Sequence, residues 1–177
     1  RPVPEAMMAL LTRAGYAPVM PKHLHGMCCG QPFKSKGFPD EARKVSSRLA
    51  NALREAGSEN CSVVTDASTC ALHMRGAEDM PPASDSVDFL LEAVLPHLKI
   101  ERRLPVVAVH HNCSAQRLRE QPRTEALAAA CADDVAVLTS ITCCGLAGDK
   151  GLFAPELTAH ALRFVRPRVP AGCKAGG

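Results

Sequence analysis

The sequence predicts an α/β fold, arranged as a tandem pseudo-repeat of two Rossmann-like units with a largely parallel sheet. Helical and extended segments alternate along the 177 residues, as they do when helices connect parallel strands. The tripeptide Cys-Cys-Gly occurs at residues 28–30 and again at 143–145. Each copy follows a predicted helix, a short strand and a loop, so the 115-residue offset (143 − 28) indicates a duplicated unit.

The first half, residues 1–98, contains the clearest helix of the sequence. Apolar residues recur at helical spacing over residues 40–56, and Gly57 is a natural end for that helix. The other elements expected here are a helix over residues 4–14, a short strand over 17–20 and a buried strand over 62–65. A loop over 77–85 and a helix over 86–98 are expected to follow.

The second half, residues 99–165, opens with the best strand candidate, the valine-rich segment 104–111. Pro155 suits the first turn of a final helix, because proline is favoured at that position. Between the strand and the final helix we expect a helix over residues 124–132 and a strand over 135–138. After the final helix we expect an irregular tail over residues 166–177.

Composition excludes several classes of protein. Apolar residues make up 46% of the chain, which is enough for a core, whereas aromatic residues make up 3% and tryptophan is absent. With a net charge of only +3 and scattered basic residues, nucleic-acid binding is disfavoured. Nine cysteines, no secretory signal and no apolar stretch of about 20 residues predict a reducing cytoplasmic setting without a transmembrane segment. A peripheral position at the inner membrane is the alternative.

Adjacent cysteines favour metal chemistry. Neighbouring Cα atoms lie about 3.8 Å apart, below the usual range for a disulfide. Two adjacent thiolates can instead reach different irons of one cluster, and the glycine lets the backbone approach it closely. Because ligands gather at the carboxyl ends of parallel strands, we expect two sites, formed by Cys28, Cys29 and Cys70, and by Cys113, Cys143 and Cys144.

Each predicted site has three cysteines, whereas an iron–sulfur cluster is normally held by about four. His73 is a candidate fourth ligand of the first site. The repeat offset would place a counterpart of Cys113 before residue 1 and a counterpart of Cys70 after residue 177, so we expect the chain to be part of a longer polypeptide. The three remaining cysteines are expected to lie outside the sites, buried or incidental: Cys61, Cys131 and Cys173.

Three segments resemble the cysteine-rich CCG domain, a tandem module of iron–sulfur oxidoreductases: residues 26–37, 65–70 and 143–151. The resemblance extends over residues 5–163 and is strongest to the C-terminal region of flavin-dependent D-lactate dehydrogenases (FAD-linked oxidases). The iron–sulfur subunit of glycolate oxidase and the B subunit of heterodisulfide reductase are other members. The leading cysteine of the first half and the closing cysteine of the second half, which are typical of the family, have no match here.

The resemblance implies an iron–sulfur electron-transfer module, with [4Fe–4S]-type clusters held by the six site cysteines. Its electrons would come from FAD, on another domain or subunit, that oxidises a 2-hydroxy acid such as D-lactate or glycolate. A ferredoxin-like domain and an electron acceptor, a quinone or another carrier, would be further partners, and this chain alone is not expected to be catalytic. Two alternatives stay open: a zinc-bound structural or docking module, and a thiol–disulfide redox domain. In this chain alone, zinc or an empty site is the alternative to a cluster.

Overall fold

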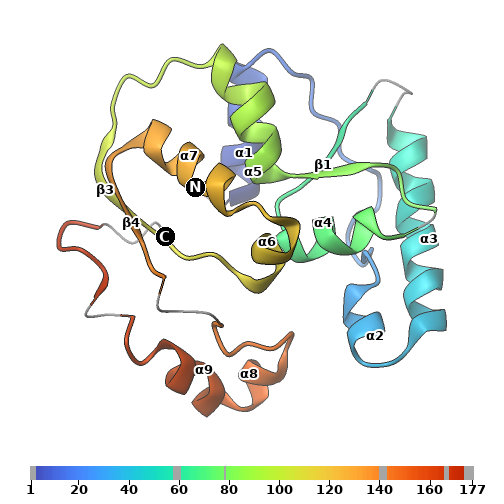
Figure 1. Ribbon diagram of the computed structural model, residues 1–177. Helices are drawn as coiled ribbons and strands as arrows, with labels where there is room; N and C mark the ends of the chain where they lie inside the picture. Colours follow the sequence, from blue (N-terminus) through green and yellow to red (C-terminus); the bar gives the residue numbers. More distant parts are fainter. Residues whose placement is uncertain (1–2, 58–60, 78, 140–142, 166–167, 174–177) are drawn as a thin grey trace. The chain divides into compact units, whose positions relative to one another are not determined.

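The computed structural model describes residues 3–57, 61–77, 79–139, 143–165 and 168–173 (Figure 1). The chain divides into two compact units, Arg1–Leu98 and Lys99–Gly177. In each, a two-stranded parallel sheet is accompanied by helices, which confirms the α/β fold. No helix among the described residues combines the length and the apolar character that crossing a membrane requires.

The first unit is mostly helical around one short sheet. Strand β1 pairs in parallel with β2, and Val63 lies opposite Ala83 in the register. Its elements, in chain order, are α1 (Val3–Arg13), α2 (Gln31–Ser35), α3 (Pro39–Ala56), β1 (Val63–Thr65), α4 (Ser68–Arg75), β2 (Ala83–Asp85), α5 (Ser86–Phe89), the π-helical turn η1 (Leu90–Val94) and the 3-10 turn η2 (Leu95–His97).

Three expectations for this unit are wrong. The apolar residues 17–20 form no strand. The segment 77–85, expected as a loop, ends in strand β2, and Asp85 then caps α5 by accepting a hydrogen bond of 2.9 Å from the backbone N–H of Val87. The single helix expected over 86–98 is divided into three short pieces, the last of which contains Pro96.

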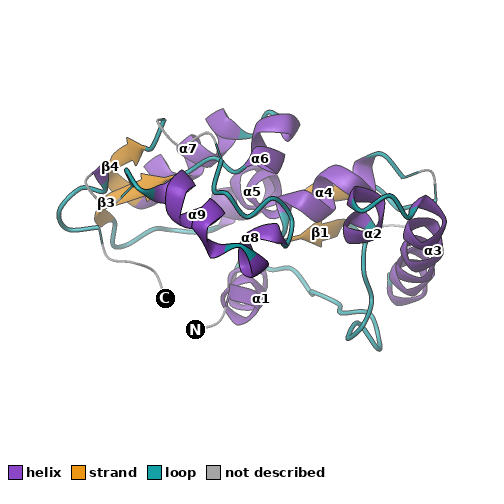
Figure 2. Ribbon diagram, turned by 90° about the horizontal axis from the view of Figure 1, so that it is seen from below, coloured by secondary structure: helices purple, strands orange, loops and turns teal. Residues whose placement is uncertain are grey.

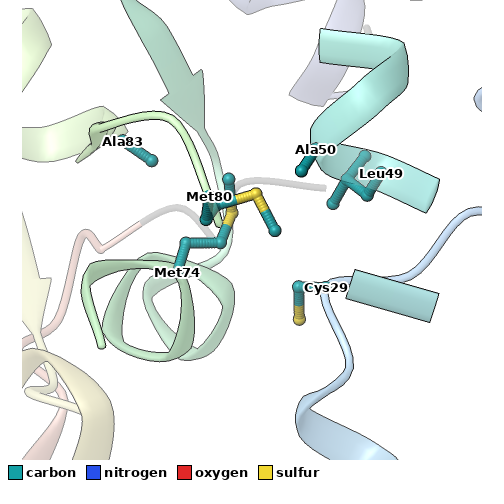
Figure 3. Close-up of a cluster of buried hydrophobic side chains, with 6 residues drawn as sticks. All are labelled: Cys29, Leu49, Ala50, Met74, Met80 and Ala83. Atoms are coloured by element: carbon teal, nitrogen blue, oxygen red, sulfur yellow. The ribbon is translucent and has the colours of Figure 1, made fainter. Parts of the chain in front are cut away.

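The core of the first unit brings one cysteine of the first tripeptide into contact with α3 and α4. Figure 3 shows Cys29 at the edge of this cluster. Its members come from the segment before α2, from α3, from α4, from the segment before β2 and from the start of β2 itself: Cys29, Leu49, Ala50, Met74, Met80 and Ala83. The position of Cys29 therefore depends on the packing of the unit and not only on its own loop.

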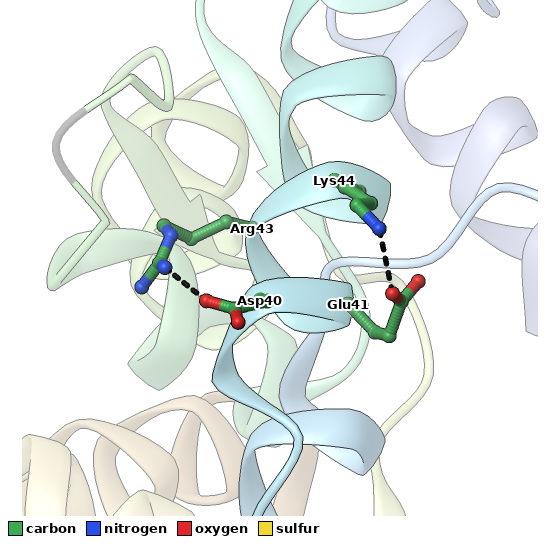
Figure 4. Close-up of polar contacts among 4 residues, drawn as sticks. All are labelled: Asp40, Glu41, Arg43 and Lys44. Atoms are coloured by element: carbon green, nitrogen blue, oxygen red, sulfur yellow. Dashed lines mark hydrogen bonds and ion pairs between the residues drawn. The ribbon is translucent and has the colours of Figure 1, made fainter.

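The opposite face of α3 is charged and exposed (Figure 4). Asp40 pairs with Arg43, and Glu41 pairs with Lys44 at 2.7 Å, each three residues along the helix. Both carboxylates lie in the first turn, where the helix dipole favours negative charge. Because all four side chains are exposed, these pairs contribute little stability, and α3 is held mainly by its buried face.

The second unit contains β3 paired in parallel with β4, and Val107 lies opposite Val135 (Figure 2). Strands β3 and β4 and helix α7 match the expected elements within a few residues, whereas α6, the other helix between the two strands, was not expected. Residues 168–173, expected to be a separate irregular tail, lie against β3, since the Cys173 thiol approaches the carbonyl oxygen of Val106 at 3.9 Å. The elements are β3 (Leu104–Val109), α6 (Cys113–Leu118), α7 (Gln121–Cys131), β4 (Ala132–Val137), α8 (Lys150–Phe153) and α9 (Pro155–Leu162).

Candidate functional site

The first tripeptide is shaped by Gly30, whose backbone has φ +98°. A Cβ at this position would lie 2.7 Å from the carbonyl oxygen of Ala42 in α3 and 3.2 Å from Nε2 of His73 in α4. Only glycine therefore fits, both in conformation and in space. The Gly30 N–H in turn donates to Sγ of Cys28 at 3.4 Å, so the close approach to α3 also fixes the neighbouring cysteine.

The second cysteine of the tripeptide meets Cys70, which lies 41 residues later in the chain and belongs to α4. Their sulfurs are 3.2 Å apart and share a hydrogen bond. This bond is the largest cause of two opposite shifts: it lowers the pKa of Cys29 to about 6 and raises the pKa of Cys70. Near neutral pH the pair therefore holds a thiolate at Cys29 and a thiol at Cys70.

Two further groups stabilise the negative sulfur. Hydrogen bonds from the backbone of Gln31 and from the side chain of Cys28 also lower the pKa of Cys29, against the opposing effect of burial. All three sulfurs predicted for the first site, those of Cys28, Cys29 and Cys70, thus interact with one another. Cys29 is only 4% exposed, whereas the other two are partly exposed.

His73 lies one turn after Cys70 on α4 and is buried. Burial is the main cause that lowers its pKa, followed by the positive charge of Lys34, while a hydrogen bond with the backbone of Cys29 acts in the opposite direction. A neutral imidazole therefore lies beside the tripeptide. The structure places His73 next to the first thiol site, where it was a candidate ligand from the sequence.

The second tripeptide repeats the construction of the first. Gly145 has φ +77°, and a Cβ there would lie 2.8 Å from both the carbonyl carbon of Leu157 and Cα of Thr158 in α9. Its N–H donates to Sγ of Cys143 at 3.4 Å, as the N–H of Gly30 does to Cys28. In both copies the glycine faces the backbone of the residue twelve positions later (42 − 30 and 157 − 145).

The second site is the more open one. Cys113 begins α6, after Asn112 caps that helix by accepting a 2.8 Å hydrogen bond from the N–H of Ala115. Burial raises the pKa of Cys113, and proximity to Cys143 and Cys144 raises it further. These three cysteines therefore interact as well, although Cys113 and Cys143 are exposed and Cys144 is partly exposed.

The donor chemistry of both sites fits a thiophilic metal group, because soft thiolates select zinc and iron–sulfur clusters. Within the described part of the chain, however, no group of three or more His, Cys, Asp or Glu has the spacing to hold one metal ion. Two thiolates on a tetrahedral ion with bonds of about 2.3 Å lie about 3.8 Å apart. The sulfurs of Cys29 and Cys70, at 3.2 Å, are closer than that, so binding a single ion requires them to separate.

The other three cysteines are not among those predicted for the two thiol sites. Cys61 is exposed and Cys131, at the end of α7, is partly exposed, so the expectation that these two are buried is wrong. Cys173 contacts β3.

Sequence reasoning did not single out a cleft of about 450 Å³ beside Cys28. One wall is a face of α3 that carries both polar and apolar side chains, and the other wall includes His23 and His25, which the sequence places just before the tripeptide. Helical spacing in the sequence could have indicated which residues share this wall of the cleft. The positions recur every three or four residues along α3 and so lie on one face of the helix: Val45, Arg48, Ala52 and Glu55.

One family comparison matches most of the chain. The model of the family described as "Cysteine-rich domain" (CCG) matches residues 1–75 and 107–169. These two segments contain all six cysteines of the two thiol sites. No solved structure matches the chain.

Proposed function

Since the chain belongs to the cysteine-rich CCG domain family, we propose that it is an iron–sulfur electron-transfer module of an oxidoreductase. The observation that carries this proposal is the repeated construction of the two thiol sites. In each unit three cysteines interact, and a glycine with positive φ lies close against a following helix and donates its N–H to the first of them. A structural cysteine has no need for such a duplicated arrangement.

The context proposed for this module is a flavin enzyme that oxidises a 2-hydroxy acid, D-lactate or glycolate. The resemblance of residues 26–37 and 143–151 to the C-terminal region of flavin-dependent D-lactate dehydrogenases supports it. The flavin would lie on another domain or subunit, and a quinone or another carrier would accept the electrons. No catalytic base is assigned to this chain, whose part is to hold the electron carrier.

In the first unit, the residues that would hold a [4Fe–4S]-type cluster are Cys28, Cys29 and Cys70. A metal ligand must be deprotonated, and the lowered pKa of Cys29 supplies a thiolate at neutral pH. The positive charge of Lys34, close enough to affect His73, partly offsets the negative charge of a thiolate site. When bound, the cluster supplies reversible one-electron transfer.

Anaerobic reconstitution of the full chain with iron and sulfide tests the proposal. We expect iron and sulfide uptake together with visible charge-transfer absorption. The double variants Cys28→Ala/Cys29→Ala and Cys143→Ala/Cys144→Ala should each lose the iron of one site. Cys61→Ala, which removes an exposed cysteine outside both sites, is the control and should take up as much iron as the unmodified chain. Absence of uptake, or equal uptake in all variants, would refute the proposal.

The flavin context has its own experiment. Reduced FAD, added without oxygen to the reconstituted chain, should bleach the visible absorption as electrons pass to the chain. Reoxidation by a soluble quinone should restore it. If iron is bound but neither reagent changes the spectrum, the metal assignment stands and the proposed donor and acceptor are wrong.

A zinc-bound structural module is the second candidate, and the position of His73 favours it. This imidazole lies beside Gly30 and hydrogen-bonds the backbone of Cys29, so Cys28, Cys29, Cys70 and His73 would be the four ligands once the sulfurs of Cys29 and Cys70 separate. Zinc gives no visible charge-transfer absorption, so metal analysis separates the two candidates. His73→Ala should lower zinc affinity if zinc is the native metal, and should leave iron uptake unchanged if a cluster is held by cysteines alone.

A further inference from the structure

We propose that Cys29 and Cys70 form a reversible disulfide, which makes the first thiol site a two-state device. In the dithiol state it can bind metal, and in the disulfide state it cannot, because a sulfur that is bonded to sulfur is no longer a thiolate ligand. The disulfide forms in the metal-free chain and does not rest on the proposed iron–sulfur function.

The distance between the sulfurs is the first argument. They lie 3.2 Å apart, and a disulfide bond is about 2.05 Å long, so closure needs an approach of about 1.2 Å. Rotation about the side-chain bonds of two cysteines provides movement of that size without moving α4. The adjacent pair Cys28 and Cys29 is a poorer choice, since neighbouring Cα atoms are closer than an ordinary disulfide allows.

The surroundings of the pair are the second argument. Cys29 is held at the edge of the core, with Leu49, Ala50 and Met74 in the same cluster. Cys70 is fixed on α4 and is partly exposed. Both sulfurs are thus held in place by packed elements, which keeps their effective concentration toward each other high. A small oxidant reaches the pair from the partly exposed side of Cys70.

The oxidant is a hydroperoxide, with hydrogen peroxide as the simplest case. One thiol of the pair is oxidised to a sulfenic acid, and the peroxide leaves as one molecule of water. The second thiol attacks the sulfenic sulfur, the S–S bond forms, and the hydroxyl leaves with the thiol proton as a second water. The two cysteines together lose two electrons and two hydrogens, and the peroxide is reduced to two waters. A dithiol reductant reverses the bond by thiol–disulfide exchange.

The experiment uses the full metal-free chain with one equivalent of hydrogen peroxide, followed by proteolysis and mass spectrometry. We expect a peptide pair joined through Cys29 and Cys70, lighter by two hydrogens than its reduced parts and separated by a dithiol. Dimedone, which labels sulfenic acids, should label neither residue in the unmodified chain. It should label Cys70 in Cys29→Ser and Cys29 in Cys70→Ser, because each variant lacks the thiol that closes the bond. Cys61→Ser should keep the crosslink.

Three results would overturn the proposal: a crosslink that joins Cys28 instead, dimedone on Cys29 or Cys70 of the unmodified chain, or no oxidation at the pair. The unmodified chain decides this even if a serine variant fails to fold. Iron and sulfide reconstitution of the oxidised chain then tests the consequence, and the first site should bind iron only after reduction. Because the crosslink is measured without metal, its failure leaves the iron–sulfur proposal intact, and failure of iron uptake leaves the crosslink readable.

Discussion

Replacing Gly30 by alanine should destabilise the first unit by an amount that can be derived from two separate costs. The backbone at φ +98° is disfavoured for a residue with a Cβ, which costs about 1–2 kcal/mol. The new Cβ would also lie 2.7 Å from the carbonyl oxygen of Ala42, and overpacking of this kind costs about 1–3 kcal/mol more. The expected loss in the free energy of unfolding is therefore about 2–5 kcal/mol.

Gly37 provides a matched control, since its φ is +85° but a Cβ added there would meet nothing within 4 Å. Gly37→Ala should show the backbone cost alone, about 1–2 kcal/mol. Urea unfolding of both variants measures the two losses in unfolding free energy, provided that the slope of this free energy against urea concentration is the same in both. In the second unit, Gly145→Ala and Gly148→Ala form the corresponding pair. If Gly30→Ala is no more destabilising than Gly37→Ala, the close packing of the tripeptide against α3 is refuted.

Three further predictions follow from the first unit. The thiolate absorbance of the metal-free chain should include a step near pH 6 for Cys29, which is protonated below this pH and ionised above it. The variant Cys70→Ala should move this step to higher pH, because the hydrogen bond between the two sulfurs is lost. A step that does not move would contradict the pairing of Cys29 with Cys70. The lowered pKa of His73 means that the unfolded chain binds its proton first, so the free energy of unfolding should fall as pH drops below about 6.5, and less steeply in His73→Gln. Asp85→Ala removes the cap on the N–H of Val87 and should cost about 1 kcal/mol by thermal unfolding, whereas Asp85→Asn, which retains an acceptor, should cost less.

The long elements could be predicted because their patterns are complete within the sequence. The apolar spacing of α3 and the valines of β3 each specify an element without reference to the rest of the chain. The expected strand 17–20 failed because it contains Pro18 and is followed by Pro21, neither of which can donate a ladder hydrogen bond. Strand β2 was missed since its residues, Ala-Ser-Asp, have no strand preference of their own and depend on pairing with β1.

In the thiol sites, too, the features that a local pattern shows could be predicted, and those that depend on packing could not. The doubled tripeptide singles out four of the nine cysteines, because the repeat is visible in the sequence itself. It does not reveal that Cys29 meets Cys70 directly, since that pairing joins the segment before α2 to α4 across 41 residues of chain. Nor does it reveal why the third letter is glycine in both copies, which depends on a carbonyl twelve residues away. The assignment of the six cysteines as metal ligands stays a prediction.

The close contact between Gly30 and the backbone of Ala42 provides a way to observe the state of the sulfurs. Because no free space separates Gly30 from the carbonyl oxygen of Ala42, a rearrangement of Cys28 or Cys29 that moves Gly30 is transmitted to the first turns of α3. Those backbone amides should exchange with deuterium at different rates when the sulfurs are free, bonded to each other or bound to metal. Helix α3, which carries no cysteine of its own, thus becomes a reporter of the chemical state of the neighbouring sulfurs.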